Sequence, residues 1–310
     1  MTFQHHTTLF RNMGLFDFLL RLRRRIIVYF LRLKTPRRLA NPDSVLRIPS
    51  RDAGRSIKAH VYRATNANSQ SPSPVFLNFH GSGFVLPLHG GDDLYCRYIS
   101  TKTPFTVFDI QYRLSPENPF PAALYDVEDV VKYVQAADHH ELYDSSRMSI
   151  GGFSAGANLS LAASSMILPP NTFRSVIAFY PPADMATPPE QKSAPDPTGK
   201  GIPPWLARVF DGSYFQNKDP YDPRISPFYA PAENFPDNVL MVTPAKDYLA
   251  DEGAALAERI KKEAGNKHVV SHRVEGYGHG WDKNASDPLS MKLRDEAYEL
   301  AAAMLNKSLE

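Results

Sequence analysis

Residues 152–156 carry the clearest chemical signature of the chain, because they place Ser154 between two glycines in a Gly-x-Ser-x-Gly pattern. The short apolar run 148–150 precedes them, as in a buried strand. The alanine- and leucine-rich run 157–168 follows and stops at two prolines, as a helix does. A serine on such a strand-to-helix turn has an exposed hydroxyl, and the helix N-terminus behind it favours developing negative charge. We expect the flanking glycines to tolerate the strained backbone, and Ser154 to be a nucleophile.

The pattern alone is weak, because it arises by chance in about one chain in ten of this length. The competing interpretation is a glycine-rich turn with a bystander serine. A serine hydroxyl becomes a useful nucleophile when a base takes its proton and a buried carboxylate orients that base. The rest of the chain must therefore supply a base, an acid and donors for an oxyanion.

Three of the ten histidines follow the serine. His268 and His272 belong to a strand pattern, where a side chain points to a sheet face. His279 lies in a glycine-rich loop just after that strand, so we predict it as the base; the alternative is a turn histidine without a role. Asp247 is the first acid after the preceding strand-like run and is predicted to orient the base. The acids at 251 and 252 fit the N-cap and first turn of the next helix.

Oxyanion donors are predicted from two places. The N–H of Ala155 follows the nucleophile directly, and the loop containing Gly81, Ser82 and Gly83 follows an early apolar strand. Each preorganised donor contributes roughly 3 kcal/mol to transition-state stabilisation. A Cβ at Ser82 costs about 1 kcal/mol if its φ is positive, and it narrows the pocket.

Strand-like and helix-like runs alternate through the chain and would position these residues. The strand-like runs are residues 45–48, 57–62, 75–79, 106–110, 148–151, 176–179, 239–242 and 269–274. The helix-like runs are residues 92–100, 122–137, 157–168, 251–264 and about 287–305. This alternation predicts an α/β fold with a mostly parallel sheet covered on both faces. The proline-rich segment 184–236 is too long for a structureless loop, and we predict a cap insertion with short helices such as 204–210.

Composition bounds the class of protein. The chain has 310 residues, 43% hydrophobic and 22% charged, which is ordinary for a globular protein with a large core. Its single cysteine, Cys96, excludes an intrachain disulfide and fits a reducing, cytoplasmic location. No closely spaced set of metal ligands is visible, so neither a metal nor a cofactor is expected. The net charge is only +2, and the basic residues of the N-terminal part are interleaved with large apolar ones, so no nucleic-acid partner is expected.

Charge is unevenly distributed, however. Residues 1–38 hold nine Arg or Lys and one acid, which makes this segment +8 and the remainder −6. On a helical projection the arginines 21, 24, 25 and 32 share one side; the opposite side gathers Leu15, Phe16, Leu19, Leu22, Ile26, Tyr29, Phe30 and Leu33. Internal charges argue against a transmembrane span and a secretory signal. Three interpretations stay open: a helix packing its apolar side on the protein, an interfacial membrane helix over about 13–38, and a mitochondrial targeting segment.

Several segments together resemble the hormone-sensitive-lipase-like family of α/β-hydrolases. Residues 80–84 resemble its H-G-G-G-[FW] motif, and residues 109–123 resemble D-Y-R-L-A-P-E followed by F-P-A-A. Residues 152–156 resemble G-D-S-A-G, 247–253 resemble D-x-L-x-D-E-G, and 279–280 begin as H-G-F does. The resemblance covers about residue 70 to the C-terminus.

The resemblance implies an α/β-hydrolase fold in residues 44–310, with a cap built from an N-terminal segment (1–43) and the insertion at about 184–236. It also implies cofactor-independent hydrolysis of carboxylic esters by Ser154, His279 and Asp247. Three residues depart from the family pattern: Ser82 and Ala157 replace glycines, and Phe153 replaces an aspartate. None of these changes deletes a catalytic group, but all alter its surroundings.

We therefore predict a serine hydrolase that acts on small esters with an apolar acyl group through an acyl-enzyme. Two alternatives keep the same fold: acyl transfer, cyclisation or rearrangement of a biosynthetic intermediate, and a non-catalytic ligand-binding protein. Peripheral membrane contact and a homodimer are further expectations. The natural substrate and its acyl length depend on cap residues that the sequence does not position.

Overall fold

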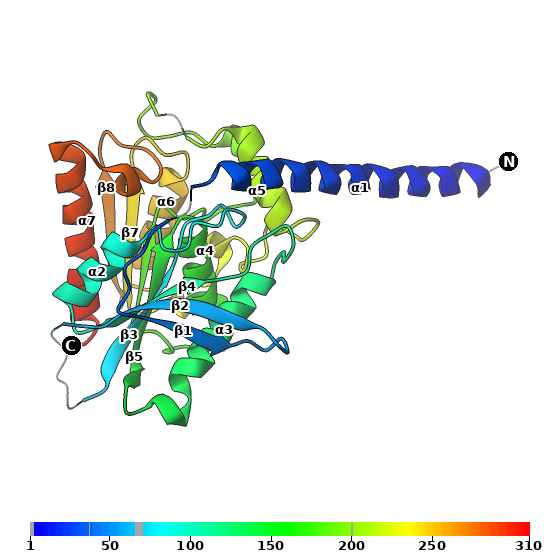
Figure 1. Ribbon diagram of the computed structural model, residues 1–310. Helices are drawn as coiled ribbons and strands as arrows, with labels where there is room; N and C mark the ends of the chain where they lie inside the picture. The colour runs from blue at the N-terminus through cyan, green and yellow to red at the C-terminus, as the bar shows by residue number, and fades with distance from the viewer. Residues whose placement is uncertain (1–2, 37, 66–70, 200) are drawn as a thin grey trace.

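An eight-stranded, mostly parallel sheet forms the centre of the computed structural model (Figure 1). The structure describes residues 3–36, 38–65, 71–199 and 201–310; within these, the side chains of residues 3–13, 15, 16 and 138 are not described. The strands lie in the order β1-β2-β4-β3-β5-β6-β7-β8. β2 runs antiparallel to both neighbours, and every other pair is parallel. The predicted α/β fold is confirmed.

All eight strand-like runs of the sequence are strands in the structure. Their bounds are β1 Ser44–Pro49, β2 Ser56–Tyr62, β3 Ser73–Phe79, β4 Thr106–Gln111, β5 Tyr143–Phe153, β6 Ser175–Phe179, β7 Asn238–Pro244 and β8 His268–Val274. β3 and β6 are buried along their whole length, as parallel strands covered on both faces must be.

Helices cover both faces of the sheet. Their bounds are α1 Phe3–Lys34, α2 Asp93–Lys102, α3 Ala122–Gln135, α4 Ala155–Ala162, α5 Pro204–Tyr214, α6 Ala250–Glu263 and α7 Pro288–Lys307. Buried residues of α3, α4 and α6 share one hydrophobic cluster with the sheet, and those of α2 and α7 share another on the opposite face (Figure 1). The run predicted as one helix over 157–168 is α4 followed by a π-helical turn, Ala163–Ile167, before the two prolines.

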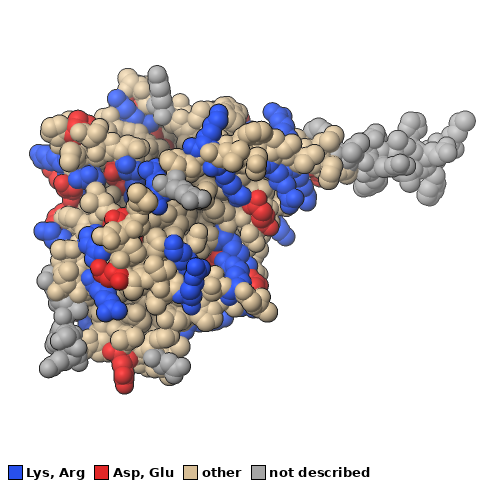
Figure 2. Space-filling model, in the orientation of Figure 1, with Lys and Arg blue, Asp and Glu red and all other residues tan. Residues whose placement is uncertain are grey.

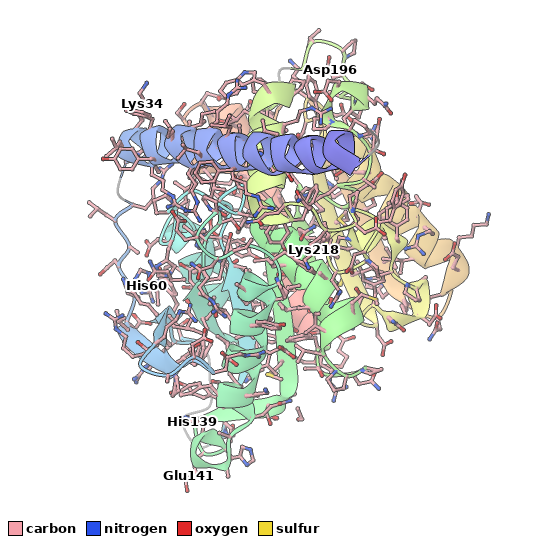
Figure 3. All side chains as sticks on the ribbon, turned by 90° about the vertical axis from the view of Figure 1, so that its right-hand side faces the viewer. Lys34, His60, His139, Glu141, Asp196 and Lys218 are labelled. Carbon is pink, nitrogen blue, oxygen red and sulfur yellow. The ribbon has the colours of Figure 1, made fainter. Side chains whose placement is uncertain are left out.

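Over its described residues, 184–199 and 201–236, the insertion contains one α-helix, α5, among short 3₁₀ turns. α1 packs on α5, and Figure 3 shows it crossing in front of this insertion, with Asp196 above it and Lys218 below. A third hydrophobic cluster joins the two helices and includes Val28, Val209 and Phe210. The N-terminal helix and the insertion therefore form one layer beside the main body.

The side of α1 that contacts the protein is not the apolar side that the sequence predicted. Val28 is buried and Ile27 and Leu31 pack against it, whereas the six predicted apolar residues from Leu19 to Leu33 are between 43% and 64% exposed. The packing interpretation is therefore wrong for that apolar side. The side chains of Leu15 and Phe16, and Arg37 altogether, lie outside the described residues.

Two arginines on the docked side fix α1 in place. Arg24 donates to the carbonyl oxygen of Gly212 at 3.1 Å. Arg32 donates to the carbonyl oxygens of Val85 and Ser115 at 2.8 and 2.7 Å, and it pairs with Glu117 at 2.9 Å. These bonds satisfy carbonyl groups that the loop after β3 and the loop after β4 leave free, so α1 is attached to the main body as well as to the insertion.

Candidate active site

Ser154 occupies the sharp turn between β5 and α4. Its backbone has φ 51° and ψ −118°, a conformation that costs a residue with a side chain about 1–3 kcal/mol. The flanking glycines are not at positive φ, so the expectation that they carry the turn's strain is wrong. They are needed for close packing instead: a Cβ on Gly152 or Gly156 would lie 2.2 or 1.9 Å from the carbonyl oxygen of Phe79.

The loops after β7 and β8 bring the predicted acid and base to this serine. His279 Nε2 lies 3.0 Å from Ser154 Oγ, and His279 Nδ1 lies 2.6 Å from Asp247 Oδ2. Asp247 is 1% exposed, and its other oxygen accepts from the N–H of Leu249 at 3.1 Å. The carboxylate is thereby fixed toward the imidazole. The three side chains form the arrangement in which a serine proton can pass to a histidine that a buried carboxylate orients.

The electrostatics of His279 suit a base. Burial disfavours the imidazolium, but the charge and hydrogen bond of Asp247 outweigh it and raise the pKa of His279 above its usual value. The Nδ1–H is committed to Asp247, so the lone pair of Nε2 faces Ser154. A raised pKa makes the imidazolium easier to form when the serine attacks.

The structure places the other predicted residues of this region outside the serine–histidine–aspartate group. His268 and His272 lie on strand β8, and the histidine bonded to Ser154 is His279. Asp251 is in the first turn of α6 and not its N-cap, which is Leu249. Glu252 in the same turn pairs with Lys192 of the insertion at 2.6 Å. These acids therefore serve the helix and the insertion.

The loop from residue 80 to 84 lies beside Ser154 and presents unpaired donors. Within the described residues, the N–H groups of Ser82, Gly83 and Ala155 have no hydrogen-bond acceptor. Positive φ occurs at Gly83 (54°) and Phe84 (63°) and not at Ser82, so the strain considered for that serine is absent. A Cβ on Gly81 would lie 3.5 Å from Ser154 Cβ, which shows how closely the loop approaches the nucleophile.

A hydrogen-bonded chain, which the sequence did not reveal, holds this loop. Ser82 Oγ accepts from the N–H of Phe84 at 2.9 Å and lies 2.6 Å from the hydroxyl of Tyr112. Tyr112 in turn donates to the carbonyl oxygen of His80 at 2.7 Å, and its ring stacks on the His80 ring. The serine that departs from the family's glycine therefore fixes the loop through its hydroxyl.

Phe153, the residue before the nucleophile, lies on a buried charged group. Lys283 Nζ is 3.1 Å from the centre of its ring, within cation–π distance. The same ammonium lies 2.8 Å from Asp92 and 2.9 Å from Asp282. Burial disfavours the ammonium, but the two carboxylates outweigh it and raise the pKa of Lys283. This charged group was not predicted from the sequence, although Asp282 and Lys283 follow the predicted base almost directly.

Two cavities meet at Ser154. One, of about 180 Å³, is lined by the loop 81–83, His279 and Tyr180, with Leu86, Ile202 and Phe210 on its apolar side. The other, of about 70 Å³, is bounded by Ala155, Met185, Asp211, Tyr248 and Leu249. A compound whose reacting carbon carries a substituent on each side can therefore place that carbon at Ser154 with one substituent in each cavity. Phe210 of α5 lines both, so the insertion shapes the space around the nucleophile.

The arrangement of sheet, serine turn and loops defines an α/β-hydrolase. The sequence profile of the alpha/beta hydrolase fold family matches residues 76–283, and the chain belongs to this family. The resemblance to its hormone-sensitive-lipase-like members is confirmed.

The curated relatives include esterases. Esterase LipI of Mycobacterium tuberculosis is 28% identical over 235 residues, which cover 73% of this chain and 71% of the relative. An arylesterase of Saccharolobus solfataricus is 27% identical over 218 residues, 67% of this chain and 68% of the relative.

Solved structures give the same result. The thermophilic carboxylesterase EstE1 from a metagenomic library superposes with a TM-score of 0.74 at 28% identity, covering 95% of this chain and 98% of that one. A hyperthermophilic esterase of Pyrobaculum calidifontis gives 0.73 at 27% identity, covering 94% and 91%. The protein is a carboxylic ester hydrolase.

Proposed function

We propose that Ser154, His279 and Asp247 carry out ester hydrolysis through an acyl-enzyme. Ser154 Oγ attacks the acyl carbon while His279 Nε2 takes its proton. The histidine then returns this proton to the leaving alcohol. A water activated by the same histidine attacks the acyl-enzyme, which releases the acid and restores the serine. The observation that supports this assignment best is the continuous pair of contacts, 3.0 and 2.6 Å, from serine to carboxylate.

We assign oxyanion stabilisation to the N–H groups of Ser82, Gly83 and Ala155. Gly81 positions the loop by its close approach to the nucleophile. The donors are fixed before substrate arrives, so their alignment costs no reorganisation in the transition state. The chain of hydroxyls through Tyr112 supports this role for Ser82, since it fixes the residue without using its N–H.

The proposed substrate is a small ester with an apolar acyl group. Its acyl and alcohol groups would occupy the two cavities that meet at the serine, both of which have apolar residues in their walls. Acyl transfer to another acceptor uses the same residues, and an added alcohol or amine tests it: transferred product in excess of acid would favour that reaction. A homodimer and a cytoplasmic location remain part of the proposal.

The assignment is tested by covalent labelling. A fluorophosphonate probe should attach to Ser154, as read by mass spectrometry, and Ser154→Ala should abolish both labelling and hydrolysis of p-nitrophenyl butyrate. Ser160→Ala is a matched control, because this buried serine lies in α4 just after the nucleophile and bonds the Gly156 carbonyl at 2.8 Å. Full activity in the Ser154→Ala variant would overturn the assignment.

We also propose peripheral membrane contact through about residues 13–38. Among the described residues, no helix has both the length and the apolar character needed to cross a bilayer. The contact we propose is at the membrane surface, through the amphipathic helix α1.

A further inference from the structure

α1 has two apolar faces, and one of them is unoccupied. The docked face contains Ile27, Val28 and Leu31, which pack with α5 and the loop after β3. The other face, here called the outer stripe, consists of Phe18, Leu19, Leu22, Ile26, Tyr29, Phe30 and Leu33. At 100° per residue the outer stripe falls within an arc of about 120° whose centre is nearly opposite the docked face. The docked contacts therefore leave the outer stripe in solvent.

The outer stripe is a continuous apolar surface. Its seven side chains are 43–64% exposed, and they span about 22 Å of helix at 1.5 Å per residue. Figure 1 shows α1 projecting beyond the rest of the molecule, so no other described element approaches the far part of this helix. Isolated exposed apolar residues are ordinary, but a contiguous row of large ones marks a surface that meets a partner.

Basic residues border the outer stripe on both sides. Arg21 and Arg25 lie along one edge, and Arg23 and Lys34 lie along the other. In Figure 2, Lys and Arg side chains lie above and below uncharged side chains along the described part of α1. None of these four side chains forms a salt bridge with another described residue.

The geometry points to the surface of an anionic bilayer as the partner of the outer stripe. Apolar side chains insert at the boundary of headgroups and acyl chains, while arginines on the borders reach lipid phosphates and carboxylates. A second copy fits poorly, because two such helices would bring two rows of arginines together. This inference deepens the membrane contact proposed above, and it does not depend on Ser154.

The C-terminal end of α1, where the outer stripe ends, leads to the larger cavity. Arg38, four residues beyond the end of α1, lines that cavity together with Ile202 and Phe210 of the insertion on which α1 packs. A protein held by the outer stripe would therefore keep its active site near the lipid. Apolar esters concentrate in bilayers, so the inferred substrates are esters dissolved in the membrane.

Co-sedimentation of the full chain with lipid vesicles tests whether the outer stripe binds a membrane. The probes are phosphatidylcholine vesicles and vesicles with 30% phosphatidylserine. The stripe variant Phe18→Ser/Ile26→Ser/Phe30→Ser should lower binding to the anionic vesicles at least tenfold. The border variant Arg21→Gln/Arg25→Gln should lower it by about fivefold for each arginine.

A matched variant on the main body controls for lost apolar surface. Leu94, Leu142 and Leu289 are 54%, 59% and 57% exposed, and their triple replacement by serine should leave vesicle binding unchanged. Both triple variants should hydrolyse p-nitrophenyl acetate, a soluble ester, at the rate of the unmodified protein. Absence of hydrolysis in the unmodified protein with intact vesicle binding would reject the proposed function and keep this inference.

Two outcomes would overturn the inference. One is no binding of the unmodified protein to anionic vesicles. The other is a dimer, seen by light scattering, that the stripe variant dissolves while vesicle binding stays the same; the outer stripe would then be an interface between copies. Equal binding to both kinds of vesicle would reject the role of the bordering arginines.

Discussion

Replacing Gly83 by alanine should displace the oxyanion loop, because the new side chain would clash with Phe210, and kcat/KM measures the effect. The added Cβ would lie 2.6 Å from Cδ2 of Phe210, far inside ordinary van der Waals contact. If the loop moves to avoid the ring, the N–H donors move with it. Loss of one donor costs roughly 3 kcal/mol, so kcat/KM should fall by about 10²–10³. The positive φ of 54° adds about 1 kcal/mol of strain for a residue with a Cβ.

A double-mutant cycle separates these two terms. In a Phe210→Ala background the obstacle is gone, so Gly83→Ala should keep the kcat/KM of that background and lower only the folding stability, by about 1 kcal/mol of strain. The coupling energy between the two positions, measured in kcat/KM, is therefore expected to be about 3 kcal/mol. The assay is steady-state hydrolysis of p-nitrophenyl butyrate by the four proteins, with thermal unfolding measured in parallel.

Gly54→Ala is the matched control for strain. Gly54 has a φ of 75°, and a Cβ there meets nothing within 4 Å. This variant should lose about 1 kcal/mol of stability and keep its kcat/KM. Additive effects of Gly83→Ala and Phe210→Ala, within about 0.5 kcal/mol, would refute the argument that the phenyl ring limits this position.

Three further predictions concern titration and hydrogen bonding. Asp247→Asn should remove the interaction that raises the pKa of His279, so the acid limb of the pH–kcat/KM profile should move to lower pH while kcat falls by roughly 10⁴; an unmoved limb would contradict the assignment. Tyr112→Phe leaves the Ser82 hydroxyl and a buried carbonyl without their partner and should cost about 1–3 kcal/mol in urea unfolding, together with a lower kcat. Burial raises the pKa of Asp211 to about 7, so its protonated form is favoured in the native state and stability declines as pH rises from about 4 to 7; the Tm of Asp211→Asn should fall less between pH 5 and 8 than that of the unmodified protein.

The sequence predicted the strands and the order of the site residues well, because both depend on local patterns. Each buried strand is a short apolar run, Asp247 is the first acid after β7, and His279 is the histidine in the loop after β8. Asp247 and His279 could be chosen for those reasons. Their mutual distance follows from the parallel pairing of β7 and β8, which brings the carboxyl ends of the two strands together.

Other features depend on contacts between distant segments and were not predictable. The hydrogen bond between Tyr112 and Ser82 joins the segments that follow β4 and β3. The salt bridge between Lys283 and Asp92 joins residues that are far apart in the sequence. For α1, the helical projection identified the larger apolar side correctly. It could not show whether that side or the smaller apolar side around Val28 contacts the rest of the protein. Arg32 decides the matter, since its three acceptors lie on the body of the protein.

The backbone of Ser154 shows that fold and reaction make opposite demands on one position. A glycine would adopt φ 51° without penalty, so stability alone selects against a side chain there. Neighbouring segments hold the backbone of Ser154 in this strained conformation. Its N–H donates to the carbonyl oxygen of Phe179 at 2.9 Å, and its carbonyl oxygen accepts from the N–H of Asn158 at 3.0 Å. The replacement of Ser154 by glycine would remove the nucleophile and relieve this strain at the same time. A descendant that no longer needed the reaction would therefore become more stable by the same change that inactivates it.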